Sequence, residues 1–225
     1  MKYFLHINTA LEDAYVAVAN ENQIIGELNS GLQKEHAGFL HPSIVTLLRD
    51  IAIKTYDLAA VSVIIGPGSY TGLRVGLSAA KGICFATGIP LINIPTTEWM
   101  VASVLKHDAM RFYPVIDARR DEIFTALYDK TGLELSPPFA HILQEGSFNN
   151  TVENFPTLFF GNGAAKCESV IKHPNALFLH KNPATSADQA AIALKKHLNG
   201  QFANLAYSEP LYVKDFYTTA VKAGK

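Results

Sequence analysis

The sequence predicts an α/β fold made of two related halves. Short apolar runs of strand type alternate with segments whose apolar residues recur at helical spacing. The order strand, glycine turn, helix occurs twice, at Gly66 and at Gly161. A chain of 225 residues can bury a sizeable core, as one large domain or two small ones. We therefore expect one subdomain over residues 1–107 and a second over residues 108–225.

The first half opens with three short strands and a helix. Strand-like runs at residues 3–8, 14–19 and 23–28 are separated by polar turns, which predicts an antiparallel meander. Over residues 35–54 the apolar side chains fall at helical spacing. Pro42 lies inside this pattern, so we expect the helix either to kink there or to begin near it.

The chain is organised around a strand, a glycine turn and a helix. An apolar run at residues 61–65 stops at Gly66-Pro67-Gly68. Ser69 or Thr71 then offers an N-cap oxygen, and the helix that follows ends near Thr87. Backbone N–H groups at such a turn can hold an anion, although a tight turn also needs glycine for backbone reasons alone. The glycine spacing matches neither the Walker phosphate loop nor the dinucleotide fingerprint.

One face of this helix is almost bare. Gly72, Gly76, Ala80 and Cys84 recur every four residues and share that face. Because glycine inside a helix costs about 1 kcal/mol relative to alanine, the stripe predicts that something packs very close to it. The neighbour is either the sheet or first helix of the same chain, or a helix of another subunit.

More strands and helices follow. Residues 91–94 predict a buried strand, and residues 96–106 a helix that ends before the boundary between the halves. In the second half, strands at residues 111–116 and 122–128 flank the polar turn Asp117–Asp121. This half therefore also begins with a meander.

The rest of the second half repeats the order of the first. A third strand at residues 133–135 should end at Pro137-Pro138, and residues 144–156 should be mostly loop. A strand at residues 158–160 leads through a glycine turn into a helix. The last helix spans residues 186–198, with Ser186 and Gln189 spaced as a capping box, and the tail that follows should dock on the body.

Composition argues against several classes of protein. Nineteen basic and twenty acidic residues give a formal net charge of -1, which disfavours unaided binding of nucleic acid. Cys84 and Cys167 lie too far apart for a metal or disulfide framework. His36 and His41 are five residues apart, so on a helix they do not form a zinc-binding pair. No apolar run reaches membrane length, and we expect a cytoplasmic protein without metal.

Several motifs, in order along nearly the whole chain, resemble the TsaB (YeaZ) family. The match is weakest over residues 133–204. The motifs that carry it are His6–Ala10, Lys34–His36, Gly66–Gly76, Ile116–Glu122 and Glu209–Tyr212. The resemblance implies the actin-like, Hsp70-like and sugar-kinase-like (ASKHA) fold. It also implies a bacterial role in making threonylcarbamoyladenosine, the modified base next to the anticodon of tRNAs that read codons starting with A.

The resemblance further implies a subunit without chemistry of its own. TsaB-like chains pair with the catalytic subunit TsaD, which the small ATPase TsaE joins, and they also form homodimers through the same N-terminal helices. tRNA is then bound only through the complex. Together with the bare helix face, this predicts a partner interface at His36, Leu40, Gly72, Arg74, Gly76 and Ala80. We expect no cofactor. Binding of ATP or ADP at a subunit interface stays an open alternative.

Two other readings stay open. One is an autonomous ATPase or metallopeptidase-like enzyme of the same fold group, with phosphate near Ser69, Thr71 and Arg74 and with Asp117 as a second carboxylate. Against it, the family usually has Asp where this chain has Asn8, and Asn supplies no charge to a metal. Asp117 with Arg119 would equally well cap a turn and form a surface ion pair. The other reading is a homodimer with a separate regulatory role.

Overall fold

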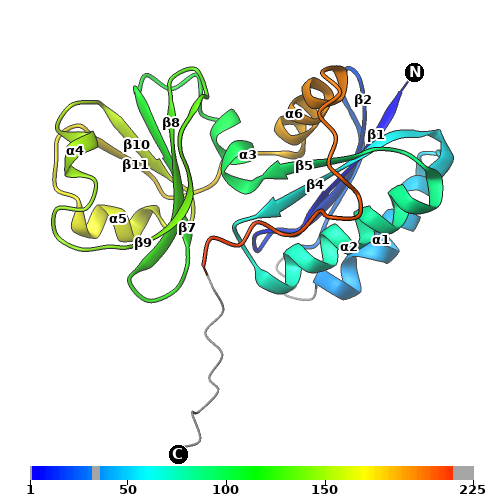
Figure 1. The fold of residues 1–225 in the computed structure, drawn as a ribbon, viewed down its shortest axis with the longest axis horizontal. Helices are drawn as coiled ribbons and strands as arrows, with labels where there is room; N and C mark the ends of the chain where they lie inside the picture. The colour runs from blue at the N-terminus through cyan, green and yellow to red at the C-terminus, as the bar shows by residue number, and fades with distance from the viewer. Residues whose placement is uncertain (1, 32–35, 215–225) are drawn as a thin grey trace, which may run out of the picture.

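The computed structural model describes residues 2–31 and 36–214, which form two lobes, each built on a mixed β-sheet (Figure 1). In the first lobe the strand order is β3-β2-β1-β4-β5, and in the second it is β11-β10-β6-β8-β7, with β9 paired to β8. The predicted α/β class is therefore confirmed. Buried side chains of α3, among them Trp99 and Met100, belong to an apolar core that includes residues of both sheets.

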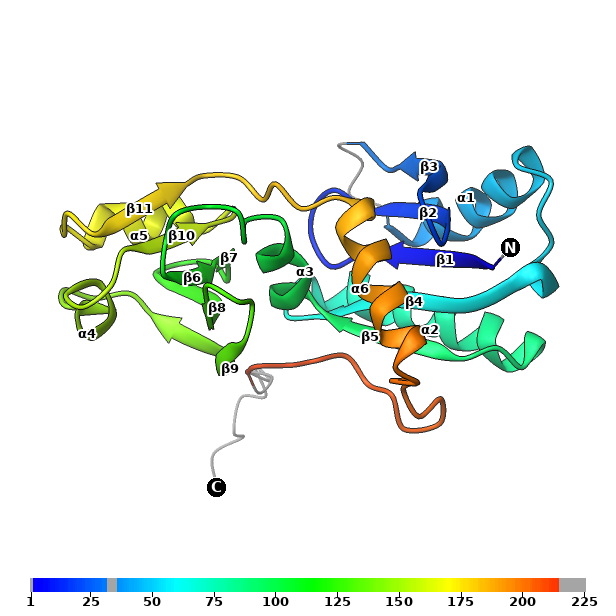
Figure 2. The same ribbon diagram turned by 90° about the horizontal axis from the view of Figure 1, so that it is seen from above.

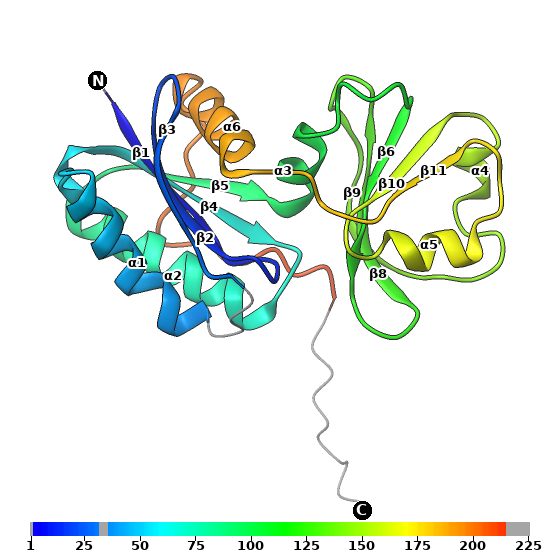
Figure 3. The ribbon, with the colours of Figure 1, turned by 180° about the vertical axis from the view of Figure 1, so that it is seen from behind.

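The first lobe has three layers. α1 and α2 cover one face of its sheet, and α6 from the end of the chain covers the other (Figures 1 and 3). β1 pairs antiparallel with β2 and parallel with β4, so the predicted meander continues into a parallel sheet. The elements are β1 Tyr3–Asn8, β2 Tyr15–Asn20, β3 Ile24–Asn29, α1 His36–Asp50, η1 Thr55–Asp57, β4 Leu58–Gly66, α2 Tyr70–Thr87, β5 Leu91–Pro95 and α3 Thr96–Ala102.

Two details of this lobe were open in the sequence. α1 continues through Pro42, and its buried side, which includes Leu40 and Ile44, faces the sheet. α2 begins with Ser69 as its N-cap, whose side chain accepts from the backbone N–H of Gly72, and ends at Gly88 in the left-handed conformation. The predicted caps of α2 are therefore confirmed.

The second lobe differs from prediction in three elements. β9 continues through Pro137-Pro138, so the predicted stop is wrong; it pairs with β8 alone among the described strands, and an edge strand tolerates proline. A short α4 lies in the predicted loop, and β11 was not predicted. The elements are β6 Arg111–Pro114, β7 Ile116–Asp117, β8 Glu122–Asp129, β9 Glu134–Ile142, α4 Asn149–Val152, β10 Thr157–Phe160, α5 Ala164–Val170, β11 Ala176–Leu179 and α6 Ser186–Leu198.

The chain returns to the first lobe at α6 (Figure 2). α6 has the predicted bounds, but its capping box is formed by Thr185 and Asp188, not by Ser186 and Gln189, because the latter two side chains are buried. Along the chain, β5 is the last strand of the first sheet and β6 the first strand of the second, whereas α6 packs on the first sheet. We therefore propose the boundary at residue 107 for the two sheets only. α6 follows that boundary in the chain but packs on the sheet of the first lobe.

The bare stripe of α2 packs against β1 and the residues that follow it. A Cβ atom added at Gly72 would overlap the carbonyl oxygen of Thr9, and one added at Gly76 would overlap the Thr9 hydroxyl. That hydroxyl donates a hydrogen bond of 2.6 Å to the Gly72 carbonyl, and Ala80 and Cys84 are at most 1% exposed. The close neighbour predicted from the stripe is therefore the chain's own sheet.

Two glycines of α2 should respond in opposite ways to replacement by alanine. Gly72→Ala pushes a methyl group into the Thr9 backbone, so we expect a loss of about 1–3 kcal/mol in the free energy of unfolding. Gly82 has open space around its Cβ position, so Gly82→Ala should raise that free energy by up to about 1 kcal/mol. Urea denaturation measures both, and equal effects would contradict the packing described.

Candidate functional site

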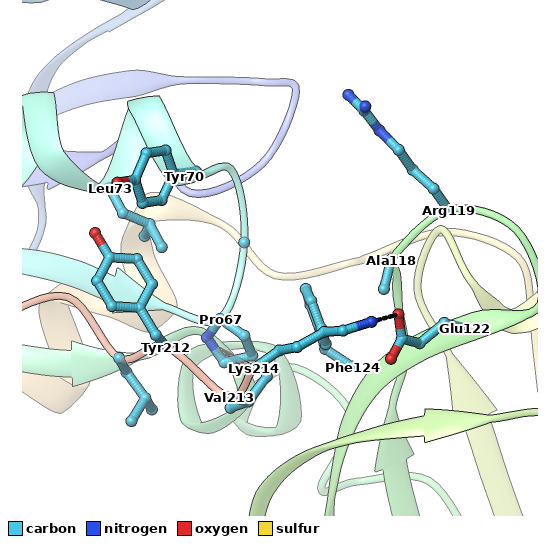
Figure 4. Close-up of a pocket in the computed structure, with 12 residues that line it drawn as sticks. Pro67, Tyr70, Leu73, Ala118, Arg119, Glu122, Phe124, Tyr212, Val213 and Lys214 are labelled. Carbon is cyan, nitrogen blue, oxygen red and sulfur yellow. Dashed lines mark hydrogen bonds and ion pairs between the residues drawn. The ribbon is translucent and has the colours of Figure 1, made fainter. Parts of the chain in front are cut away.

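A cavity of about 450 Å³ lies between the lobes (Figure 4). Three segments line it: the glycine turn with the start of α2, the hairpin from β7 to β8, and the C-terminal segment. Its residues are Pro67, Gly68, Tyr70, Leu73, Ala118, Arg119, Glu122, Phe124 and Leu211–Lys214. Apolar and aromatic side chains therefore meet a few charged ones in the cleft.

The C-terminal segment ties the two lobes together. The Leu211 N–H donates to the Ile65 carbonyl at 2.7 Å, and a Cβ atom at Gly66 would lie 2.6 Å from the Leu211 oxygen. Gly66 has a φ of 121°, which an L side chain rarely adopts, so only glycine fits here. At the other end, Lys214 Nζ lies 2.6 Å from a Glu122 carboxylate oxygen in the second lobe. The tail docks as predicted.

Arg74, one of the predicted interface residues, contacts this segment. Its Nε donates to the Tyr212 hydroxyl at 2.8 Å, and its guanidinium lies 4.0 Å from the centre of the Tyr70 ring. The hydrogen bond to Tyr212 raises the pKa of Arg74 above its ordinary value. Arg74 therefore helps to hold the tail on α2, and its solvent-exposed side chain lies at the edge of the cleft.

A second, more polar cavity of about 610 Å³ opens beside the β7–β8 hairpin. Its residues are Glu12, Asp117, Arg119, Arg120, Asn162 and Lys166. Lys166 Nζ lies 2.6 Å from Asp117 Oδ1, and the same oxygen accepts the Arg119 N–H at 2.6 Å. Burial by itself raises the pKa of Asp117, but these hydrogen bonds outweigh it and the pKa lies below its ordinary value. Asp117 thus caps the turn and pairs with Lys166, not with Arg119.

The turn itself has an unusual backbone. Arg119 and Arg120 have φ values of 71° and 49°, a region that glycine and asparagine normally occupy. Each such residue costs on the order of 1 kcal/mol. Contacts from the neighbouring glycine turn compensate: Asn162 Oδ1 accepts the Asp117 N–H, and Lys166 also donates to the Arg120 carbonyl. The hairpin is consequently held in one conformation.

The predicted nucleotide contacts do not converge. Ser69 donates its N–H to the Ala10 carbonyl and uses its hydroxyl as the cap of α2. Thr71 is exposed on the first turn of α2, and of the three residues only Asp117 lines either of the two cavities described above. Sequence reasoning missed Lys166, which is 49 positions from its partner Asp117. The one sequence signal for Lys166 was the order strand, glycine turn, helix around Gly161, which places Lys166 near the end of a strand.

Asn8 belongs to a buried polar cluster and lines neither cavity. Its Oδ1 accepts the Ala10 N–H at 3.0 Å. Nearby, His6 Nδ1 lies 2.8 Å from the Ser62 hydroxyl, and Gln189 of α6 donates to the same hydroxyl at 2.9 Å. These side chains are at most 1% exposed. The cluster fastens α6 to the sheet, and no sequence pattern pointed to it.

Most of the predicted partner interface is inside the chain. Leu40, Gly72, Gly76 and Ala80 are buried against other parts of the first lobe, so they present no surface to a partner and their assignment is corrected. His36 begins α1, but its side chain lies outside the described residues, as do Lys34 and Glu35. The error arises because spacing identifies a small-residue face without saying what covers it.

The opposite faces of the same two helices are exposed. Val45 of α1 is 67% exposed and Phe85 of α2 is 83% exposed. α2 also presents the small residues Ser78, Gly82 and Ala86 to solvent. We call the exposed sides of α1 and α2 the helical face; both helices lie on the same side of the sheet (Figure 3). The exposed residues of α2 recur at helical spacing, so the sequence pattern could have identified the helical face.

The cysteines and acidic residues form no obvious chemical centre. Among the described residues, no three His, Cys, Asp or Glu side chains gather where they could hold a metal ion. Cys84 and Cys167 are both buried with free thiols, and burial raises the pKa of Cys84 to about 11. In the same part of the chain, none of the helices has the length and apolarity to cross a bilayer.

Two lobes with related sheets on either side of a cleft define the ASKHA class of folds. Solved structures from Pseudomonas aeruginosa share it. One titled YeaZ has a TM-score of 0.75 at 21% identity and covers 94% of this chain and 100% of that chain. Another, described as similar to peptidase YEAZ, has a TM-score of 0.79 at 20% identity and covers 95% and 100%.

Sequence comparisons give the family. The model of the TsaD family, tRNA N6-adenosine threonylcarbamoyltransferase, matches residues 30–215. The tRNA threonylcarbamoyladenosine biosynthesis protein TsaB of Bacillus subtilis is 30% identical over 171 residues, 75% of this chain and 74% of that protein. The TsaB of Escherichia coli is 25% identical over 231 residues, 94% of each. The chain belongs to the TsaB (YeaZ) family.

The buried cluster predicts an acid-sensitive fold. Burial lowers the pKa of His6 to about 3, whereas an unfolded histidine titrates near 6.5. Between these values the unfolded chain binds the extra proton, so the contribution of His6 is complete above about pH 6.5 and is lost as the pH falls. The loss approaches 1.4 kcal/mol per pH unit at the acidic end.

In His6→Gln, unfolding free energy measured between about pH 4 and 6 should therefore depend less steeply on pH, by close to one proton. His141 and His197, whose pKa values burial also lowers, stay in both proteins and cancel in the comparison. An unchanged slope would contradict a neutral, buried His6.

Proposed function

We propose that the chain is a non-catalytic scaffold subunit. It activates a TsaD-like catalytic subunit that transfers the threonylcarbamoyl group to the adenosine next to the anticodon of tRNAs reading codons that start with A. A TsaE-like ATPase joins the same complex, and tRNA binds through the assembly. The observation that carries this proposal is the exposed, weakly charged helical face in a chain of the TsaB family.

The helical face has the chemistry of a protein contact. Large apolar side chains that are two-thirds or more exposed, as Val45 and Phe85 are, favour burial in a complex. Gly82 supports the same conclusion, because a mid-helix glycine is unfavourable and nothing inside the chain needs the space. A partner helix that approaches closely would account for it. The buried stripe on the other side of α2 holds this face rigid.

A homodimer would use the same surface. An isologous dimer through the helical face would bury Val45 and Phe85 of both copies, so self-association and pairing with the catalytic subunit would exclude each other.

The competing class is an autonomous ATPase or metallopeptidase-like enzyme. The side chains it would need are engaged elsewhere: the Asp117 carboxylate by Lys166, the Ser69 hydroxyl by the cap of α2, and Asn8 by a buried turn. These contacts support the scaffold function over the enzyme function. ATP hydrolysis or tRNA modification by the purified chain alone, lost in Asp117→Ala, would overturn it in favour of the enzyme.

Charge placed on the helical face should abolish pairing. In Phe85→Glu the exposed ring is replaced by a carboxylate that a partner would have to bury unpaired, so affinity for the TsaD homologue of the same genome should fall at least tenfold. Ile142→Glu is the matched control, since Ile142 is 65% exposed on β9 of the other lobe. Light scattering of mixtures measures complex size, and indistinguishable behaviour of the two variants would contradict this interface.

Gly82→Leu tests how closely the partner approaches. The free chain has room for the side chain, so stability should be kept, while the complex should weaken if a partner helix lies against Gly82. Retention of both stability and full affinity would place the contact elsewhere on α1 and α2.

A further inference from the structure

The dipeptide Asn-Gly occurs twice in the chain, at Asn162-Gly163 and at Asn199-Gly200. Glycine after asparagine leaves the next backbone nitrogen unshielded, because glycine has no side chain and turns freely. That nitrogen can attack the carbonyl carbon of the asparagine side chain, provided that the local backbone can reach an attack geometry. The two pairs have the same sequence, so their surroundings decide which of them can react.

The surroundings of Asn162 hold its backbone in place. Its Oδ1 accepts the Asp117 N–H at 2.9 Å, and the Gly163 N–H donates to the Val115 carbonyl at 3.2 Å. A Cβ atom added at Gly163 would lie 2.7 Å from a methyl carbon of Val115, so the turn packs directly on the segment that joins β6 to β7. Both reacting groups are therefore engaged, and freeing them requires the turn to leave that segment.

Asn199 lies at the exposed C-terminal end of α6. Within residues 2–31 and 36–214 its side-chain amide has no hydrogen-bond partner, and the residue is exposed to solvent. Gly200 is exposed as well, and the space around its Cβ position is open. The Gly200 N–H donates to the His197 carbonyl at 3.1 Å, a contact that is lost whenever the last turn of the helix frays. An attack geometry is thus within reach of a small local opening.

We infer that Asn199 is a site of spontaneous deamidation in the folded protein, whereas Asn162 is protected. The Gly200 nitrogen bonds to the side-chain carbonyl carbon of Asn199, and the amide group leaves as ammonia with the proton of that nitrogen. A cyclic succinimide remains, which water opens to aspartate or to isoaspartate. The net reaction consumes water and releases ammonia, without oxidation or reduction. It needs no partner, so it is independent of the proposed function.

The products change the junction between α6 and the C-terminal segment. A carboxylate at position 199 lies at the negative end of the helix dipole, where it is unfavourable. Isoaspartate also adds a carbon atom to the backbone, which displaces the Gln201 N–H from the Lys196 carbonyl that accepts it at 2.9 Å. The segment that runs from here to the cleft is then anchored less firmly at its start.

The test compares the two pairs in one sample. The full chain is incubated in mildly alkaline buffer, and a parallel sample is incubated in concentrated urea. Peptide mapping by mass spectrometry, with chromatographic separation of the aspartate and isoaspartate products, gives the rate at each asparagine. Asn199→Gln and Asn162→Gln are the matched variants, because glutamine keeps the amide but has to close a larger ring.

In native buffer Asn199 should react at least roughly tenfold faster than Asn162, because the end of a helix opens far more often than a packed turn. In urea the two rates should come within about threefold of each other, since the protection by the fold is then lost. The native signal should disappear in Asn199→Gln and persist in Asn162→Gln.

Equal native rates at the two pairs, or a faster reaction at Asn162, would overturn the inference. An Asn199 that stays intact in native buffer would do the same, because the helix end would then be protective. A native difference that persisted unchanged in urea would also overturn it, since the cause would then be the neighbouring sequence and not the fold.

Discussion

The contact between α2 and the end of β1 sets the geometry of the first lobe. Backbone atoms and the Thr9 hydroxyl occupy the space where side chains of Gly72 and Gly76 would be. Because this contact admits no intervening side chain, α2 has one position on the sheet, and α1 packs beside it. The same contact sets where the glycine turn meets the C-terminal segment and where the outward surface of α2 points.

α2 therefore has two small-residue faces with different purposes. Gly72 and Gly76 allow the helix to approach its own sheet, whereas Gly82 faces solvent and stabilises nothing in the free chain. The inward glycines are explained by packing within the chain, whereas no packing within the described chain explains the outward Gly82. The distinction moves the proposed partner surface from the buried stripe to the side that carries Phe85, while keeping it on the same helices.

Sequence reasoning succeeded where the signal was local. The caps at Ser69 and Gly88, the meander and the bounds of α6 each depend on neighbouring residues and were predicted correctly. The family followed from motifs in the same order. Predictions failed where the outcome depended on distant parts of the chain: β9 passes through its prolines because it lies at an edge, and nothing local tells which face of α2 is covered. The pairing of Lys166 with Asp117 joins segments 49 residues apart.

The return of α6 makes the second lobe an insertion within the first. Gln189 meets Ser62 across 127 positions, and the segment after α6 hydrogen-bonds to β5 through Ala203 and Leu91. On the ribosome, the first sheet would thus emerge with one face and one edge uncovered and would wait for the whole inserted lobe to be made. Contacts of such long sequence separation slow folding and leave a half-built sheet open to aggregation. The first lobe, although encoded first, is completed last.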